Sequence, residues 1–176
     1  APLLEPRWLH KRLPDVVKGR VDVLLATVGA LEDFRTTMEV VAIPDSPTGP
    51  GHVVRLTGAP PSPWPGVETR RFPHDWSSYE FLLLDVRLVA GPPETQRFSV
   101  RCDDFVGRKE ATWIATPFMA TSEWQTFRIP LIERRVTDGN TLQERIFNNQ
   151  DVDRILLYLP RPDERAVLEI DNLRLE

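Results

Sequence analysis

The residue types that most often carry catalysis are few in this chain, and their spacing does not bring them together. His10, His52 and His74 stand alone in stretches that read as loops or strand ends, and no His/Cys/Asp group has the spacing of a zinc site. The string Gly49-Pro50-Gly51 lacks the Lys-Ser/Thr of a phosphate-binding loop. The single cysteine, Cys102, falls on the apolar row of a predicted strand, where a buried thiol is inert.

Paired carboxylates of the kind that cleave glycosidic bonds are not singled out by spacing either. Several acids on or beside the predicted strands are candidates, and nothing selects two of them: Asp85, Asp103, Asp104, Glu110 and Glu169. We therefore expect no enzymatic activity.

Arginine is the residue type in excess, because only three of the 22 Lys+Arg residues are lysines. A guanidinium offers a planar fork of donors that suits paired oxygens, although genomic base composition produces the same bias. The cations are outnumbered by 26 Asp+Glu, which gives a net charge of −4. This balance provides no general attraction to a nucleic acid backbone or to an anionic membrane.

The length and composition indicate one domain with a packed core. The chain has 176 residues, is 41% hydrophobic and contains 17 prolines without a repeat, which excludes collagen-like and largely disordered chains. One cysteine cannot form an intrachain disulfide. The longest apolar runs, at 23–26, 81–84 and 155–159, are far shorter than the roughly 18 residues that span a bilayer. The start, Ala1 to Pro6, lacks the pattern of an export signal.

Short β-rich runs separated by Pro/Gly clusters dominate the chain from Glu32 onward. We predict an all-β fold, an antiparallel two-sheet β-sandwich of about eight to ten strands with one or two short helices. One helix is expected at Leu142 to Phe147. The predicted strands are Met38 to Ile43, Val53 to Thr57, Gly66 to Phe72, Glu80 to Leu88, Gln96 to Cys102, Ala111 to Thr116, Trp124 to Leu131, Arg154 to Leu159 and Val167 to Leu175.

Residues 1–30 read as a lead-in segment to a module that covers residues 31–176. Residues 1–20 are expected to be extended, whereas the apolar spacing from Val17 to Val28 fits a helix and also a strand. This segment is a candidate for the tail of an upstream domain.

Alternation along the predicted strands separates an apolar row from a polar row. Phe98, Val100 and Cys102 form an inward row, which leaves the intervening residues outside. If the strands are neighbours, one sheet carries an arginine-rich outer surface of Asp85, Arg87, Arg97, Arg101, Arg128, Arg154 and Tyr158. Such a surface is either simply solvated or, because like charges on adjacent strands repel, balanced by acids or an anionic ligand.

Four strings resemble the galactose-binding-domain-like superfamily. They are Asp75-Trp76-Ser77-Ser78-Tyr79-Glu80-Phe81-Leu82, Trp124-Gln125-Thr126-Phe127-Arg128-Ile129-Pro130-Leu131, Val152 to Leu159, and Leu168-Glu169-Ile170-Asp171-Asn172-Leu173-Arg174-Leu175. Within that superfamily the chain is similar to carbohydrate-binding modules of family 11, to modules attached to agarases, and to the complex I intermediate-associated assembly factor. The likeness covers about residues 31–176 and implies a jelly-roll β-sandwich. Upstream, Asp22 to Ala30 resembles the tail of VanZ-like membrane domains.

The resemblance implies a non-catalytic module that binds a poly- or oligosaccharide and raises the local concentration of a fused or partner activity. Its location would be extracellular, periplasmic or at the cell surface. The alternative that the same resemblance allows is a protein-binding assembly or scaffold module.

Sugar rings present C–H faces to aromatic rings, while arginines and carboxylates bind hydroxyl groups. Trp76 and Trp124 begin strands in the motifs, so we interpret them as core anchors. Trp64, between two prolines, is either a ligand platform or a hydrophobic plug, and Trp113 faces outward if Ile114 faces the core. The predicted ligand-binding residues are Trp113, Tyr158, Arg101, Arg128, Arg154, Asp85, Arg87 and Trp64.

A structural calcium ion is the one cofactor that the resemblance implies. Asp171 lies in the closing motif, and Glu32 and Asp33 would supply the other oxygen ligands. Arg35 stands where related modules often have another acid. In the competing interpretation, Asp171 is satisfied by backbone N–H groups of a turn.

Overall fold

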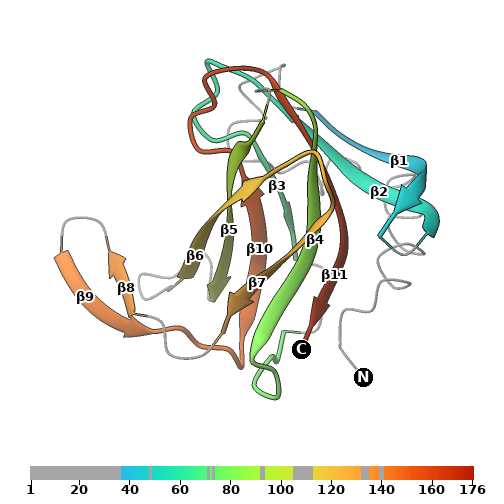
Figure 1. Cartoon of the computed structure of the whole chain (residues 1–176). Helices are drawn as coiled ribbons and strands as arrows, with labels where there is room; N and C mark the ends of the chain where they lie inside the picture. The colour runs from blue at the N-terminus through green and yellow to red at the C-terminus, as the bar shows by residue number, and fades with distance from the viewer. Residues whose placement is uncertain are drawn as a thin grey trace.

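Two antiparallel sheets face each other in the computed structural model (Figure 1). The structure describes residues 37–47, 49–70, 72, 74–91, 94–104, 113–131, 135–138 and 141–176. The five-stranded sheet has the order β1 (Thr37–Ser46), β2 (Gly49–Gly58), β11 (Ala166–Leu175), β4 (Phe81–Ala90) and β7 (Gln125–Pro130). The four-stranded sheet has the order β3 (Gly66–Thr69), β10 (Val152–Tyr158), β5 (Gln96–Asp104) and β6 (Trp113–Ala120).

The core between the sheets is built from the apolar rows that alternation predicts. Leu82 and Leu84 of β4 face Phe98 and Val100 of β5 within one buried cluster. Trp76, expected to anchor the core, is fully buried. Burial of this continuous apolar layer is the main force that holds the two sheets together.

All nine predicted strands overlap an observed strand, and the fold class is confirmed. The predicted helix at Leu142 to Phe147 is wrong, because residues Thr141–Ile146 form β9, which pairs with β8 (Arg135–Asp138). A six-residue segment gains too few hydrogen bonds to offset helix nucleation, whereas a hairpin partner satisfies its backbone directly. The part of the chain that the structure describes contains no helix, and so none that could cross a membrane.

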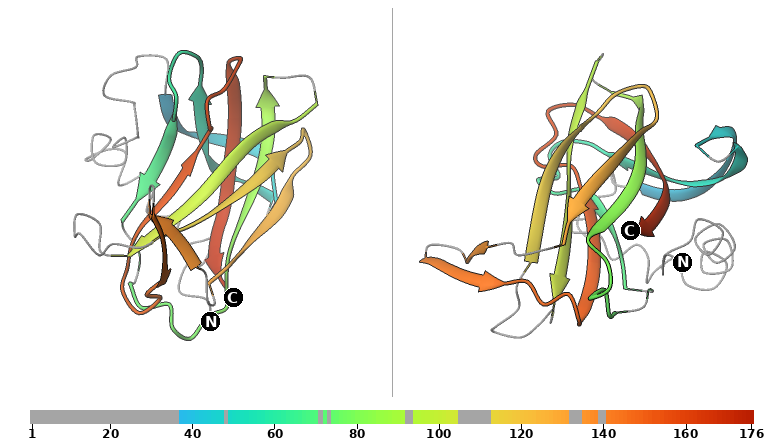
Figure 2. Two further views of the ribbon diagram at one scale, coloured as in Figure 1. Left: turned by 90° about the vertical axis from the view of Figure 1, so that its left-hand side faces the viewer. Right: turned by 60° about the horizontal axis from the view of Figure 1, so that its bottom comes forward.

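Two hairpins extend from opposite sides of the sandwich. The β1–β2 hairpin projects on one side and the β8–β9 hairpin on the other (Figures 1 and 2). The outer surface of the four-stranded sheet lies on the side away from the β1–β2 hairpin and faces the viewer in the left panel of Figure 2.

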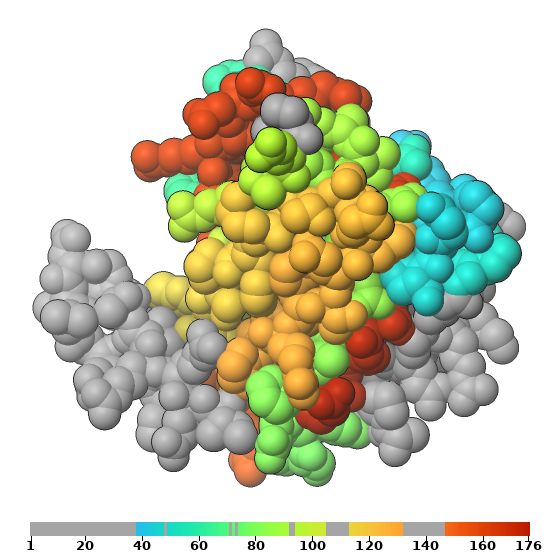
Figure 3. Space-filling view, in the orientation of Figure 1, coloured from blue at the N-terminus to red at the C-terminus, as the bar shows by residue number. Residues whose placement is uncertain are grey.

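The edge strands β6 and β7 close one side of the sandwich, where they lie side by side (Figure 3). Phe118 of β6 and Phe127 of β7 stack with ring centroids 4.9 Å apart, and both contact Phe98 in the core. Pro117 is tolerated within β6 because an edge strand has one side free of ladder hydrogen bonds.

Candidate functional site

The predicted ligand-binding residues divide between the two sheets. Strands β5 and β10 belong to the four-stranded sheet and carry Arg101, Arg154 and Tyr158, while β4 and β7 belong to the five-stranded sheet. The expectation of one shared arginine-rich surface is therefore wrong for Asp85, Arg87 and Arg128. Alternation assigns a residue to a face of its own strand, but it does not say which strands are neighbours.

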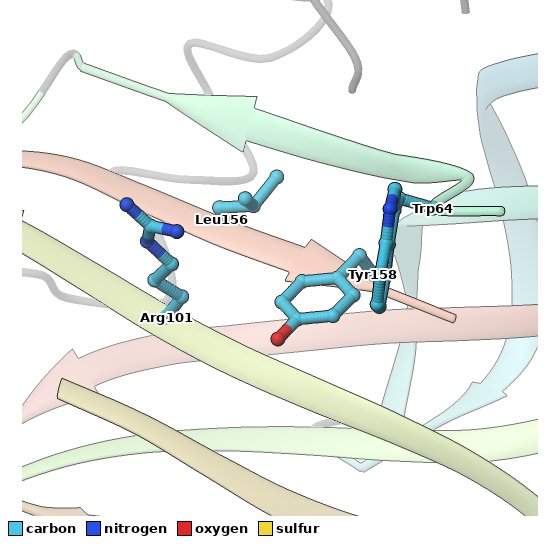
Figure 4. Close-up of a pocket in the computed structure, with 4 residues that line it drawn as sticks. All are labelled: Trp64, Arg101, Leu156 and Tyr158. Atoms are coloured by element: carbon cyan, nitrogen blue, oxygen red, sulfur yellow. The ribbon is translucent and has the colours of Figure 1, made fainter. Parts of the chain in front are cut away.

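A hollow of about 230 Å³ lies on the outer face of the four-stranded sheet, lined by Trp64, Arg101, Leu156 and Tyr158 (Figure 4). The Trp64 and Tyr158 rings are 5.8 Å apart and close to perpendicular, at 76°. Figure 4 shows Tyr158 nearly face-on and Trp64 edge-on. The two rings therefore form a floor and a wall.

Small neighbours leave the ring of Tyr158 uncovered. In the strand register, Tyr158 lies opposite Gly66 of β3 on one side and Ser99 of β5 on the other. On the next strand, Pro117 and Ala115 of β6 lie opposite Ser99 and Arg101. The hollow exists because these positions carry little side-chain volume.

Trp64 is held in place by the backbone on both sides of it. The Leu159 N–H donates to the carbonyl of Pro65 at 2.8 Å, and the Arg161 N–H donates to the carbonyl of Pro63 at 2.7 Å. The guanidinium of Arg161 also lies over the Trp64 ring, 5.5 Å from its centroid. The proline-flanked loop thus fixes the indole beside the end of β10, with 38% of the residue exposed.

Four charged residues alternate in sign across this face. Glu68 accepts a hydrogen bond from Arg154 Nη1 at 3.0 Å, Arg154 Nε donates to Asp103 Oδ2 at 2.7 Å, and Arg101 Nε donates to Asp103 Oδ1 at 2.7 Å. The Arg101 guanidinium stacks 4.5 Å from the centroid of half-buried Trp113. Burial alone would lower the pKa of Arg154, but the charges and hydrogen bonds of Asp103 and Glu68 outweigh it and raise that pKa. We call Glu68, Arg154, Asp103 and Arg101 the open ladder.

A second ladder crosses the outer face of the five-stranded sheet. Glu169, fully buried, accepts hydrogen bonds from Arg55 Nη2 at 2.7 Å and from Arg87 Nε at 2.8 Å. Arg87 donates its two terminal nitrogens to Asp45 at 2.8 and 3.2 Å and stacks 4.8 Å from Trp124. The hydrogen bond from Arg87 lowers the pKa of Asp45. We call Arg55, Glu169, Arg87 and Asp45 the closed ladder.

The remaining predicted residues of the five-stranded sheet are engaged within the protein. Asp85 is buried and accepts hydrogen bonds from Thr126 Oγ1 at 2.6 Å and Asn172 Nδ2 at 2.8 Å. Arg128 pairs with Glu176 and lies 4.4 Å from the centroid of Phe81. These contacts are those expected of structural residues.

The described residues around Asp171 do not make up a calcium site. Asp171 is fully buried, and its Oδ1 accepts the backbone N–H of Asn172 at 2.7 Å. Within the described ranges no group of three His, Cys, Asp or Glu residues converges. Glu32 and Asp33 lie outside these ranges. Calcium binding stays a prediction, and a melting temperature unchanged by EDTA would count against it.

The sequence analysis did not name Glu68 or Leu156 among the ligand-binding residues, although alternation places Leu156 on the same row as Arg154 and Tyr158, and it treated Asp103 only as an unselected acid. The signal was available for Leu156, which alternates between Arg154 and Tyr158 on the outer row of β10. Glu68 and Gly66 share the outer face of β3, but a four-residue strand gives too short a pattern to assign.

Comparison with known proteins bears on the fold. No protein-family model and no curated sequence matches the chain. A family 11 carbohydrate-binding module from Clostridium thermocellum, in complex with a β-1,3-1,4-mixed-linked tetrasaccharide, matches with a TM-score of 0.58 and 17% identity over 80% of this chain and 81% of that one. A family 30 carbohydrate-binding module matches with a TM-score of 0.55 and 19% identity, covering 79% and 73%.

An exo-β-agarase matches with a TM-score of 0.61 and 13% identity over 81% of this chain, which corresponds to only 22% of the agarase. The resemblance to the complex I assembly factor stays a prediction. The chain has the two-sheet β-sandwich fold of carbohydrate-binding modules such as those of families 11 and 30.

Proposed function

We propose that this chain is a non-catalytic carbohydrate-binding module, and that it binds an oligosaccharide segment on the outer face of the four-stranded sheet. The observation that carries the proposal is the hollow, where the ring of Tyr158 forms a floor, Trp64 forms a wall and Arg101 lies across from them (Figure 4).

This geometry suits the two surfaces of a sugar ring. The C–H face packs on an aromatic ring, and the hydroxyl groups at the rim accept and donate hydrogen bonds. Trp64 already contacts Tyr158 and Arg161, so Tyr158 offers the ring face for stacking. The volume of about 230 Å³ is below the roughly 300–1,000 Å³ of pockets for drug-sized ligands, and it suits one ring of a longer chain.

The charges of the open ladder suit a neutral glycan. The open ladder contains two arginines and two acids, so its formal charges cancel. The repulsion among arginines that an acidic sugar would relieve is already relieved by Asp103 and Glu68. A uronic or sulfated ligand is therefore not needed to explain these arginines.

The same contacts argue against glycoside cleavage here. A glycosidase needs one carboxyl group as an acid and another as a base or nucleophile. Arginine donates hydrogen bonds to both oxygens of Asp103 and to one oxygen of Glu68, so these carboxyl groups are engaged within the protein. Binding to a polysaccharide implies a location outside the cytoplasm, in the periplasm or at the cell surface.

Affinity electrophoresis tests the proposal. The wild-type protein is run in gels that contain mixed-linkage β-1,3-1,4-glucan, agarose or other neutral polysaccharides, with Tyr158→Ala and Arg128→Ala as matched variants. We expect retardation of the wild type by at least one glycan, an affinity about tenfold lower for Tyr158→Ala, and no change for Arg128→Ala. No retardation by any glycan would overturn the proposal and favour the protein-binding alternative.

A further inference from the structure

We propose that Asp103 is a positioning residue, which fixes Arg101 so that its two terminal nitrogens bind a pair of adjacent hydroxyl groups on a neutral sugar. This inference rests on the proposed function and says which residues of the same site would bind the sugar hydroxyl groups.

Asp103 joins Arg101 and Arg154. Its side chain is 2% exposed, and each of its oxygens accepts one Nε–H at 2.7 Å, Oδ1 from Arg101 and Oδ2 from Arg154. A buried carboxylate with both oxygens engaged has little rotamer freedom. The positions of both guanidinium groups are therefore set from beneath the surface.

Arg154 and Arg101 differ in how many of their N–H donors are left for a ligand. Arg154 donates Nη1 to Glu68 and is only 16% exposed at its side chain, so it is committed to the protein. Arg101 uses Nε alone: within the described ranges, no hydrogen bond joins either terminal nitrogen to the protein. Its guanidinium lies beside Leu156 across the hollow from Tyr158 (Figure 4).

The closed ladder is an internal comparison for this assignment. There a buried carboxylate, Glu169, also lies between two arginines. The terminal nitrogens of Arg87 both donate hydrogen bonds to Asp45. Arg55 donates from Nε and Nη2 to Glu169, and its Nη1 lies 3.8 Å from a carboxylate oxygen of Glu39. Both ladders thus contain a buried carboxylate between two arginines. On the face with the hollow, the terminal nitrogens of Arg101 form an open fork, with no partner among the described residues, whereas on the opposite face the fork of Arg87 is closed by Asp45.

The open fork suits one chemical class of ligand. Two parallel N–H donors in a plane match two oxygens side by side, such as vicinal hydroxyl groups. Stacking on Trp113 and the bond to Asp103 hold the guanidinium before the ligand arrives, so little side-chain entropy is lost on binding. The balanced charge of the open ladder leaves no net positive charge that would favour an acidic sugar over a neutral one.

The test compares four variants by titration calorimetry, using the neutral oligosaccharide of whichever glycan retards the wild type. Arg101→Lys keeps the charge and removes the fork, and we expect an affinity at least tenfold lower, measured at a temperature where the variant is fully folded. Asp103→Asn should weaken binding about tenfold, and the Arg101 Nε–H signal in NMR spectra should move upfield and sharpen as that side chain is released. Glu169→Gln, on the opposite face, should lower stability while leaving affinity within twofold, and Arg128→Ala should change neither by more than a small amount.

The outcomes separate the inference from the proposed function. A wild type that binds no glycan overturns both. A wild type that binds, with Arg101→Lys and Asp103→Asn binding equally well, overturns this inference alone. Equal weakening by Glu169→Gln and Asp103→Asn also overturns it, because stability rather than Arg101 would then explain the loss.

Discussion

Buried carboxylates set between two arginines occur on both outer faces, at Asp103 and at Glu169. A charge taken out of water is tolerated only where partners replace its hydration. Glu169 has no exposed side-chain surface, so its two guanidinium partners provide nearly all of that replacement. Its role is to join β2, β11 and β4 across the sheet.

Substitution of Glu169 by glutamine should therefore destabilise the fold. The change removes the negative charge between Arg55 and Arg87 and replaces one acceptor oxygen by an NH2 donor, and we expect the free energy of unfolding to fall by about 3 kcal/mol. Denaturant unfolding followed by tryptophan fluorescence measures this value. Arg128→Ala, which breaks an exposed pair, should cost no more than about 1 kcal/mol. Equal losses for the two variants would contradict the structural role of Glu169.

The buried thiol of Cys102 should make the fold less stable at alkaline pH. Burial, with a smaller contribution from the charge of Asp103, raises the pKa of its thiol far above the ordinary value. In the unfolded chain the thiol ionises near pH 8.5, so above that pH the unfolded state holds fewer protons and stability falls. Its contribution is fully present below about pH 8.5 and is lost as pH rises.

The thiol prediction is checked by comparing the wild type with Cys102→Ala between pH 8 and 10. The free energy of unfolding of the wild type should fall more steeply, by up to about 1.4 kcal/mol per pH unit. Parallel pH curves would show that Cys102 is not buried as described.

Single residues were the most predictable part of the site. Trp113 faces outward opposite Ile114, and Cys102 faces the core, as alternation predicted. Alternation does not predict which residue pairs with each charged side chain. Arg87 and Arg101 occupy similar positions in their strands, yet Asp45 closes the fork of one and none of the described residues closes that of the other.

Among the elements, β3 is the strand whose exact packing matters most for the hollow. A Cβ added at Gly66 would lie 2.5 Å from the carbonyl oxygen of Leu157 and 2.7 Å from Cβ of Tyr158. Only glycine allows β3 to approach β10 this closely.

Gly66→Ala should push β3 away from β10 and displace the ring of Tyr158. We expect a loss of about 1–3 kcal/mol in the free energy of unfolding. The variant should also bind glycan more weakly at a temperature where it is still fully folded. Calorimetric titration together with thermal unfolding measures both effects, and wild-type affinity in a destabilised variant would argue that Tyr158 does not contact the ligand.

Strands were predicted more reliably than sheets because the two depend on different interactions. A strand is marked by its own alternation and its flanking Pro/Gly residues, whereas sheet membership depends on pairing between distant segments. The β8–β9 hairpin was missed although Asp138-Gly139-Asn140, between two short β-prone runs, is a hairpin signal. Its short apolar spacing was interpreted as a helical turn.

At the scale of the whole molecule, the fold leaves two outer faces whose arginines are paired differently. Structural matches of 17–19% identity establish the sandwich, but a fold does not by itself assign a ligand. The assignment of a ligand-binding surface depends on one difference between the two outer faces. The four-stranded sheet combines a partly exposed aromatic ring with an arginine whose terminal nitrogens have no partner among the described residues, whereas on the five-stranded sheet the residues of the closed ladder are bound to one another.

The most direct test of this contrast is a titration of the ¹⁵N-labelled wild-type chain with the glycan oligosaccharide, followed by two-dimensional NMR. The account predicts the largest shift changes at Ser99, Arg101, Leu156 and Tyr158 and at the indole N–H of Trp64, with Arg87 and Arg128 unaffected. Shift changes that instead cluster around Arg87, Trp124 and Arg128 would place the ligand on the five-stranded sheet and contradict the account.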